Sequence, residues 1–143
     1  MRRSLLIVLV SFASCIPIEG AAEITLGTGY ETFTPIADGD PVAVLRGPQG
    51  GNHIWAAARA SRGLDPIQLQ LVLHMEKDGV EINDGPVWAV VDMIPRGQLN
   101  EFVGFRAYVP VPEQILGNEL LLRLVATDRE GRTAEDQRTV VPK

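Results

Sequence analysis

The segment from Ile67 to Glu76 constrains the fold of this chain more than any other part of the sequence. Apolar and mostly polar residues alternate through it without a break over ten positions. Successive side chains of a β-strand point to opposite faces, so the pattern predicts a strand with one face on a core and the other toward solvent. The apolar positions are Ile67, Leu69, Leu71, Leu73 and Met75, and the intervening positions are Gln68, Gln70, Val72, His74 and Glu76.

Turn signals recur about every ten residues in the rest of the chain, and no helical pattern reaches ten residues. Lys77-Asp78-Gly79 carries the Asp-Gly pair of a tight hairpin, and Asp128 to Gly131 has the preferred ends of a type I turn. An antiparallel β-sandwich or barrel is therefore expected, and segment 87–94, apolar on both faces, predicts a central strand. The clearest expected strands cover residues 42–46, 53–59, 67–76, 87–94, 102–109, 120–127 and 132–141, and segments 23–26 and 80–83 are candidates for a short first strand and a ragged return strand.

The last predicted hairpin resembles the final two strands of bacterial immunoglobulin-like domains. In those domains an apolar strand runs into Thr-Asp-x-x-Gly, here Thr127 to Gly131, and a polar strand returns. The resemblance implies an immunoglobulin-like β-sandwich of seven or eight strands. Cys15 is the single cysteine, so hydrophobic packing must hold the sandwich without a disulfide, and about 130 residues bury enough apolar surface for that.

The first residues predict an export signal over residues 1–14. Arg2 and Arg3 precede the apolar run from Leu5 to Val10, and small residues follow. This run is too short to span a bilayer stably. The mature protein is therefore expected outside the cytoplasm.

The sequence Phe12-Ala13-Ser14-Cys15 resembles the bacterial lipoprotein cleavage box, with Phe12 where that family usually has Leu. The resemblance implies that Cys15 is lipidated and anchors the chain to a membrane, with residues 15–22 as a tether and residues 23–143 as the β-sandwich domain. Ile16, where inner-membrane lipoproteins commonly have Asp, favours the outer membrane. The alternative is a cut after Ala22, which would release a soluble periplasmic or secreted protein. With its Gly-Pro-Gln-Gly-Gly-x-His segment, the whole chain is similar to small uncharacterised bacterial envelope proteins.

The charge balance excludes some classes of partner. Of the 13 basic residues, Arg2 and Arg3 fall in the signal, so the segment from Cys15 onward keeps 11 against 18 acidic residues, a formal net charge of −7. Nucleic-acid recognition requires a basic surface, and so does electrostatic binding to anionic lipid head groups. The expected partners are an envelope protein or a glycan, together with the membrane through Cys15, and not a nucleic acid.

The segment from Gly47 to Trp55 is the densest cluster of special residues in the chain. Three glycines and Pro48 predict a tight, irregular turn between two strands, and a ligand site built on His53 is the alternative. Ile54, Ala56 and Ala58 are expected on one face of the following strand, opposite His53, Trp55, Ala57 and Arg59. The candidate ligand-binding residues are His53, Trp55, Arg59 and Gln49. Trp88, in the other tryptophan-bearing segment, is expected in the core.

Catalysis and cofactors have little support in the sequence. Past Cys15, Ser61 is the single serine, and it lies in a turn and not in a Gly-x-Ser-x-Gly elbow. His53, His74, Met75 and Met93 form a thin copper set, since adjacent strand residues such as His74 and Met75 point to opposite faces. The acidic turns at Asp38 to Asp40, Asp84 and Asp128 do not match the helix-loop-helix calcium loop. The predicted function is a non-catalytic envelope binding or scaffolding module without metal or cofactor; a periplasmic copper- or calcium-binding protein and a small unrecognised enzyme are the alternatives.

Overall fold

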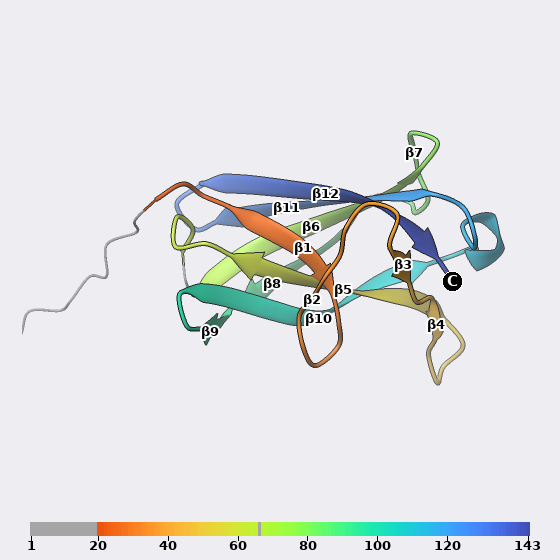
Figure 1. Ribbon diagram of the computed structural model, residues 1–143, viewed down its shortest axis with the longest axis horizontal. Coiled ribbons are helices and arrows are strands. Elements are labelled where there is room, and N and C mark those ends of the chain that lie inside the picture. Colours follow the sequence, from red (N-terminus) through yellow and green to blue (C-terminus); the bar gives the residue numbers. More distant parts are fainter. Residues whose placement is uncertain (1–19, 66) are drawn as a thin grey trace, which may run out of the picture.

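A computed structural model describes residues 20–65 and 67–143 of the chain (Figure 1). Over this part the protein is built from twelve strands and one short 3-10 helix, η1 (Pro112–Gln114). Four of the strands, β2, β3, β4 and β7, are only two residues long. The strands are β1 (Ile24–Thr28), β2 (Thr34–Pro35), β3 (Pro41–Val42), β4 (Leu45–Arg46), β5 (Asn52–Ala60), β6 (Gln68–Lys77), β7 (Val80–Glu81), β8 (Val87–Asp92), β9 (Ile94–Arg96), β10 (Leu99–Val109), β11 (Leu120–Asp128) and β12 (Thr133–Pro142).

The strands form two sheets that pack face to face. The first sheet has the order β2-β1-β5-β10-β9. The short strand β4 pairs with the first residues of β5, which β1 does not reach. The second has the order β3-β12-β11-β6-β7, and β8 pairs with β6 along the same edge as β7. All pairings are antiparallel except that of β3 with β12. In Figure 1 the β4–β5 turn and the β6–β7 hairpin project from the same end of the molecule.

The core lies between the two sheets and is filled by the alternating apolar positions that the sequence displays. The odd-numbered side chains of β6 from Leu69 to Met75 are buried, and so are Leu120, Leu122 and Leu124 on β11. Ile67, predicted to begin the same buried face, precedes β6 and is 60% exposed, so the buried face is one residue shorter than the alternation indicated. β5 contributes Ile54, Ala56 and Ala58, as its alternation predicted. Burial of apolar surface, at about 25 cal/mol per Å², is the main force that holds the sheets together.

The strand order is that of an immunoglobulin-like sandwich. In that fold strands A, B, E and D form one sheet and C, F and G the other, with an added C′ strand in many members. Here β1, β5, β10 and β9 take the first set of places, and β12, β11, β6 and β8 the second. The predicted fold class is therefore confirmed, including the final hairpin of β11 and β12.

Two of the predicted strands differ in the structure. The segment expected as one central strand over 87–94 is two strands, β8 in the second sheet and β9 in the first, and β8 lies at an edge with its outward side chains exposed. The strand expected over 42–46 also divides, because β3 pairs with β12 and β4 with β5. Apolar composition alone cannot reveal that a chain passes from one sheet to the other.

The predicted export signal, Cys15 and most of the tether lie outside the described residues. Within residues 20–65 and 67–143, no helix is long and apolar enough to cross a membrane.

Candidate functional site

Three of the four predicted ligand-binding residues share one surface of the first sheet. His53, Trp55 and Arg59 alternate along β5 and point away from the core, and β1 and β10 flank them. We call this surface the β5 outer face. Its remaining members come from β4, from β10 and from the loop that follows β1, and they are Leu45, Arg106, Tyr108, Tyr30 and Phe33.

On the β5 outer face the protein's own side chains engage Trp55 and Arg59, whereas Tyr30, Leu45 and Tyr108 are themselves exposed. The loop after β1 folds back over the sheet, and the Tyr30 ring lies 4.8 Å from that of Trp55. Arg59 lies over the Phe33 ring and donates from Nη2 to Glu101 Oε1 at 2.6 Å. Gly27 lies directly beneath the Phe33 ring, where a Cβ would collide with it. The binding groups of Trp55 and Arg59 are therefore already engaged within the chain.

His53 is more deeply buried than its predicted place on a polar face implies. It is 5% exposed, its ring packs edge-on against Trp55 at 4.6 Å, and its Nδ1 has no hydrogen-bond partner among the described residues. Burial and the nearby Arg106 guanidinium lower the pKa of His53, so the imidazole is neutral at pH 7. A neutral, covered imidazole is a packing group of this face, and a ligand would reach it only after its neighbours move.

Gln49 lies apart from the other three candidates. The amide N–H of Gly50 donates to the carbonyl of Gly47, which closes a turn with Pro48 and Gln49 at its exposed corners. Gly50 has a φ of 95°. The predicted tight turn between two strands is confirmed, since it joins β4 to β5.

Trp88 contradicts the prediction that it belongs to the core. It lies on β8, points away from the other sheet and is 65% exposed. Val72 on β6 and Val125 on β11 continue the same row across the second sheet, and Val90, 55% exposed, follows Trp88 along β8. We call the surface formed by Trp88, Val90, Val72 and Val125 the Trp88 face.

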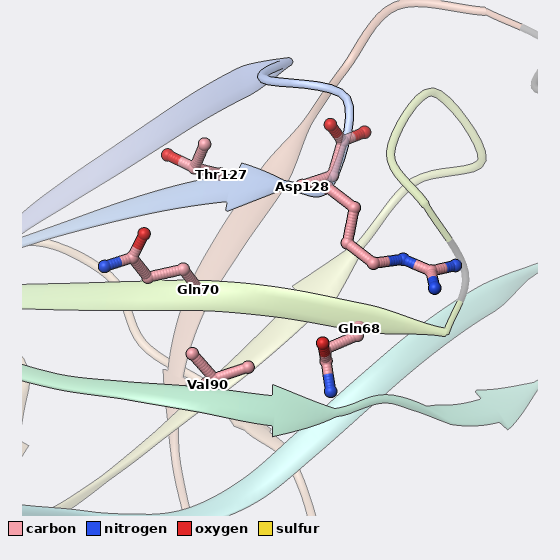
Figure 2. Close-up of a pocket in the computed structure, with 6 residues that line it drawn as sticks. Gln68, Gln70, Val90, Thr127 and Asp128 are labelled. Atoms are coloured by element: carbon pink, nitrogen blue, oxygen red, sulfur yellow. The ribbon is translucent and has the colours of Figure 1, made fainter.

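A shallow hollow of about 180 Å³ adjoins the Trp88 face. Val90, Gln70 and Thr127 form one row across β8, β6 and β11, as Figure 2 shows. Gln68, Asp128 and Arg129 complete the lining. The surface therefore combines an exposed indole with amide, hydroxyl and guanidinium groups on one sheet.

The charged groups of the hollow are already paired inside the protein. Arg129 Nε donates to Asp65 Oδ2 at 2.8 Å, and Arg132 Nε donates to Asp128 Oδ2 at 2.7 Å. Asp128 also accepts from the amides of Asp65, Glu130 and Arg132. The neutral Gln70 and Thr127 are therefore the groups best placed to bind a ligand there.

Asp65 and Asp128 join two loops at this end of the sandwich, and the pKa of each carboxyl is lowered. Burial acts to raise the pKa of each carboxyl, but hydrogen bonds from Arg129 and the Ile67 amide outweigh it at Asp65, and those from the Arg132 backbone and side chain outweigh it at Asp128. Both pKa values therefore lie below the ordinary range, and both groups are ionised at neutral pH.

The serine, copper and calcium candidates from the sequence either make structural hydrogen bonds or lie too far apart to form a site. The Ser61 hydroxyl accepts from the Glu23 amide and donates to the Ala21 carbonyl, which holds the start of β1. Met75 and Met93 are buried in the core, and the two histidines lie on different sheets, so the copper set does not come together. Of the acidic turns, Asp38 and Asp40 accept backbone N–H groups.

The Trp88 face was missed because an apolar segment such as 87–92 gives no sign of which of its sides is covered. The exposed positions alternate with covered ones, which is a period-two signal, but apolar residues on both sides of the strand hide it. An edge strand with an apolar outer side therefore resembles a central strand in sequence.

Together these features define an immunoglobulin-like β-sandwich domain whose two outer sheet surfaces each carry one tryptophan, Trp55 partly covered and Trp88 exposed. The sequence matches no protein-family model and no curated protein sequence. The N-terminal domain of PorA is similar in structure over 82% of this chain and 97% of its own, at 12% identity and a TM-score of 0.37. The CooA pilin subunit of enterotoxigenic Escherichia coli covers 83% and 97%, at 8% identity and 0.32. A DUF4466 family protein from Parabacteroides merdae covers 80% of this chain and 42% of its own, at 17% identity and 0.30.

Proposed function

We propose that this protein is an exported, non-catalytic binding module of the cell envelope, and that its Trp88 face binds a glycan. The observation that carries the proposal is the 65% exposure of Trp88 on the second sheet beside the polar hollow. An indole left in water forgoes much of the stabilisation that its burial would bring. A partner that covers it would recover that energy.

The chemistry of the hollow favours an uncharged, hydroxyl-rich partner. Arg129 is neutralised by Asp65, and Asp128 by Arg132, so neither an anion nor a cation finds a free counter-charge there. Gln70 and Thr127 offer both donors and acceptors, which suits sugar hydroxyls. The apolar face of a sugar ring would stack on Trp88 while its hydroxyls bond to the amide and hydroxyl groups beside it.

Anchoring at Cys15 is part of the same proposal. The cleavage-box resemblance supports lipidation there, and the net charge of −7 for the mature chain makes a purely electrostatic attachment to anionic lipid unfavourable. Replacing Cys15 by alanine should move the protein from the membrane to the soluble fraction without unfolding the domain. Membrane retention equal to wild type would contradict the anchor.

The tryptophan content permits a direct test of the glycan. The chain has two tryptophans, so Trp55→Phe leaves Trp88 as the sole indole. Titration of this variant with soluble peptidoglycan fragments and with lipopolysaccharide-derived oligosaccharides should change Trp88 fluorescence, with a Kd of about 0.1–1 mM for one stacking platform and few hydrogen bonds.

Two further variants complete the test. Trp88→Ala and Gln70→Ala should each weaken glycan binding at least tenfold in calorimetry, whereas Val80→Ala, an exposed apolar residue of the β7 hairpin, should not. Unchanged Trp88 fluorescence with every sugar would overturn the proposal that the Trp88 face binds a glycan. Capture of an envelope protein that depends on Trp88 would keep the binding face and replace its ligand.

A further inference from the structure

Three metal-ligand side chains meet at the β6–β7 hairpin. His74 and Glu76 lie two residues apart on β6 and share its outward face, and Glu81 on β7 pairs directly with Glu76. One ligand atom from each lies within 4.8 Å of the others, and all three side chains are partly buried. They belong to a different part of the second sheet from the hollow.

The hairpin holds Glu81 in a fixed position. Its Oε1 accepts the Met75 amide at 2.9 Å, and its Oε2 lies 3.0 Å from His74 Nδ1. The connecting turn is the tight two-residue type, since Asp78 and Gly79 both have positive φ, 52° and 77°. The backbone contact therefore occupies one carboxylate oxygen and directs the other toward the imidazole.

The charges around the hairpin favour an added cation. Glu76 and Glu81 are directly opposite each other across the ladder, and like charges in that position are destabilising. Arg123 Nη2, at 3.8 Å from Glu76 Oε1, offsets them only in part. A divalent ion between the two carboxylates would remove the repulsion.

We propose that His74, Glu76 and Glu81 form a binding site for a divalent transition metal ion of the zinc class. One imidazole nitrogen and two carboxylate oxygens are a zinc donor set, whereas calcium and magnesium prefer oxygen ligands alone. The three protein ligands would leave one coordination position for water or for a group of a partner. His74 and Glu81 belong to different strands, and the hairpin register brings them together, so this ligand set is not among the metal candidates that the sequence suggested.

Calorimetric titration with zinc chloride tests the site. The untagged mature chain should carry Cys15→Ala, which removes a thiolate that would compete for zinc. We expect one ion per chain with a micromolar Kd. The affinity for zinc should fall at least tenfold in His74→Ala and in Glu81→Gln. The glutamine side chain of the second variant keeps an oxygen that can accept the Met75 amide. Saturating zinc should also raise Tm by about 5–10 °C, since the ion binds the folded chain alone.

Matched variants separate this site from adventitious binding. His53→Gln changes the other histidine, and Glu135→Gln changes an exposed carboxylate of β12, so both should bind zinc as wild type does. Arg123→Gln should tighten binding severalfold by removing the competing cation. Equal zinc binding by wild type and His74→Ala, with both chains folded by circular dichroism, would overturn the proposal. Weaker binding by Arg123→Gln would overturn it as well.

Discussion

Each outer sheet surface of this sandwich carries one of the two tryptophans, and the two indoles differ in exposure. On the β5 outer face, Tyr30 covers Trp55 and Glu101 pairs with Arg59. On the Trp88 face the indole lies at an edge strand with no described segment folded over it. The difference arises because β1 continues into a loop long enough to return across its own sheet, whereas β8 continues directly into β9 of the other sheet.

This comparison teaches that an aromatic side chain on a sheet surface is best interpreted through the connections around it. Trp55 has the sequence neighbours of a binding site, since histidine, arginine and a glycine-rich turn surround it. In the structure His53 packs against Trp55, and Arg59 is engaged by Phe33 and Glu101. Trp88 lies in a plain apolar run, and it is the indole that remains accessible.

The largest expected effect tests which side of β6 belongs to the core and which to the open surface. Leu71 is completely buried, and Gln70 beside it lines the hollow. Leu71→Asp places a charge in the core and should cost several kcal/mol of unfolding free energy, whereas Gln70→Asp should cost less than about 0.5 kcal/mol. Urea denaturation measures both. Equal midpoints would show that the two faces of β6 have been confused.

The next effect concerns the loops that support the Trp88 face at its hollow. Asp128→Asn removes the charge that binds Arg132 and offers amide hydrogens to backbone N–H groups, so it should destabilise the fold by about 2–4 kcal/mol. Glu130→Gln, an exposed neighbour in the same turn, is the control. A small loss in Asp128→Asn, like that of the control, would mean that the hollow does not depend on this carboxylate.

Removing Trp55 should destabilise the fold more than removing Trp88, although Trp88 is the residue proposed to bind the ligand. Trp55→Ala removes a ring packed against His53 and Tyr30 and should cost about 2–3 kcal/mol, less than for a fully buried ring. Trp88→Ala removes an exposed ring and should stay within about 0.5 kcal/mol of wild type. Thermal unfolding at one pH measures both, and equal losses would erase the contrast between the faces.

The smallest expected effect is the loss of unfolding free energy as the pH is lowered. The pKa values of Asp65 and Asp128 are lowered in the folded chain, so their contribution is complete above the unfolded value of about 3.9 and is lost as pH falls through the lower folded values. Wild type should therefore lose more stability than Asp128→Asn between pH 5 and pH 3. Parallel losses in the two proteins would assign the acid sensitivity to other groups.

The sequence predicted the parts of the fold that depend on local patterns. The alternation of β6, the Asp78-Gly79 turn and the final hairpin follow from side-chain period and turn chemistry, and the structure confirms all three. The division of residues 87–96 between two sheets was not predicted, because it depends on which strand each half meets.

For the candidate site on β5, the sequence predicted which side chains share a face but not how far they are covered. His53, Trp55 and Arg59 do share a face, as their alternation required. The loop that covers them lies more than fifteen residues earlier, in a segment with little periodicity, and its return across Gly27 leaves no local signal. Their role in ligand binding stays a prediction, and so does that of Gln49.

The passage of residues 87–96 from one sheet to the other has a consequence for cooperativity. β8 is bonded to β6 and β9 to β10, and Met93 between them is buried and donates its amide to Ile67. Neither sheet can open without pulling on the other through this short connection, so the domain should unfold in a single transition. Trp55 reports on the first sheet and Trp88 on the second, and fluorescence of the two single-tryptophan variants should show their sheets melting together within each protein, coincident with loss of circular dichroism.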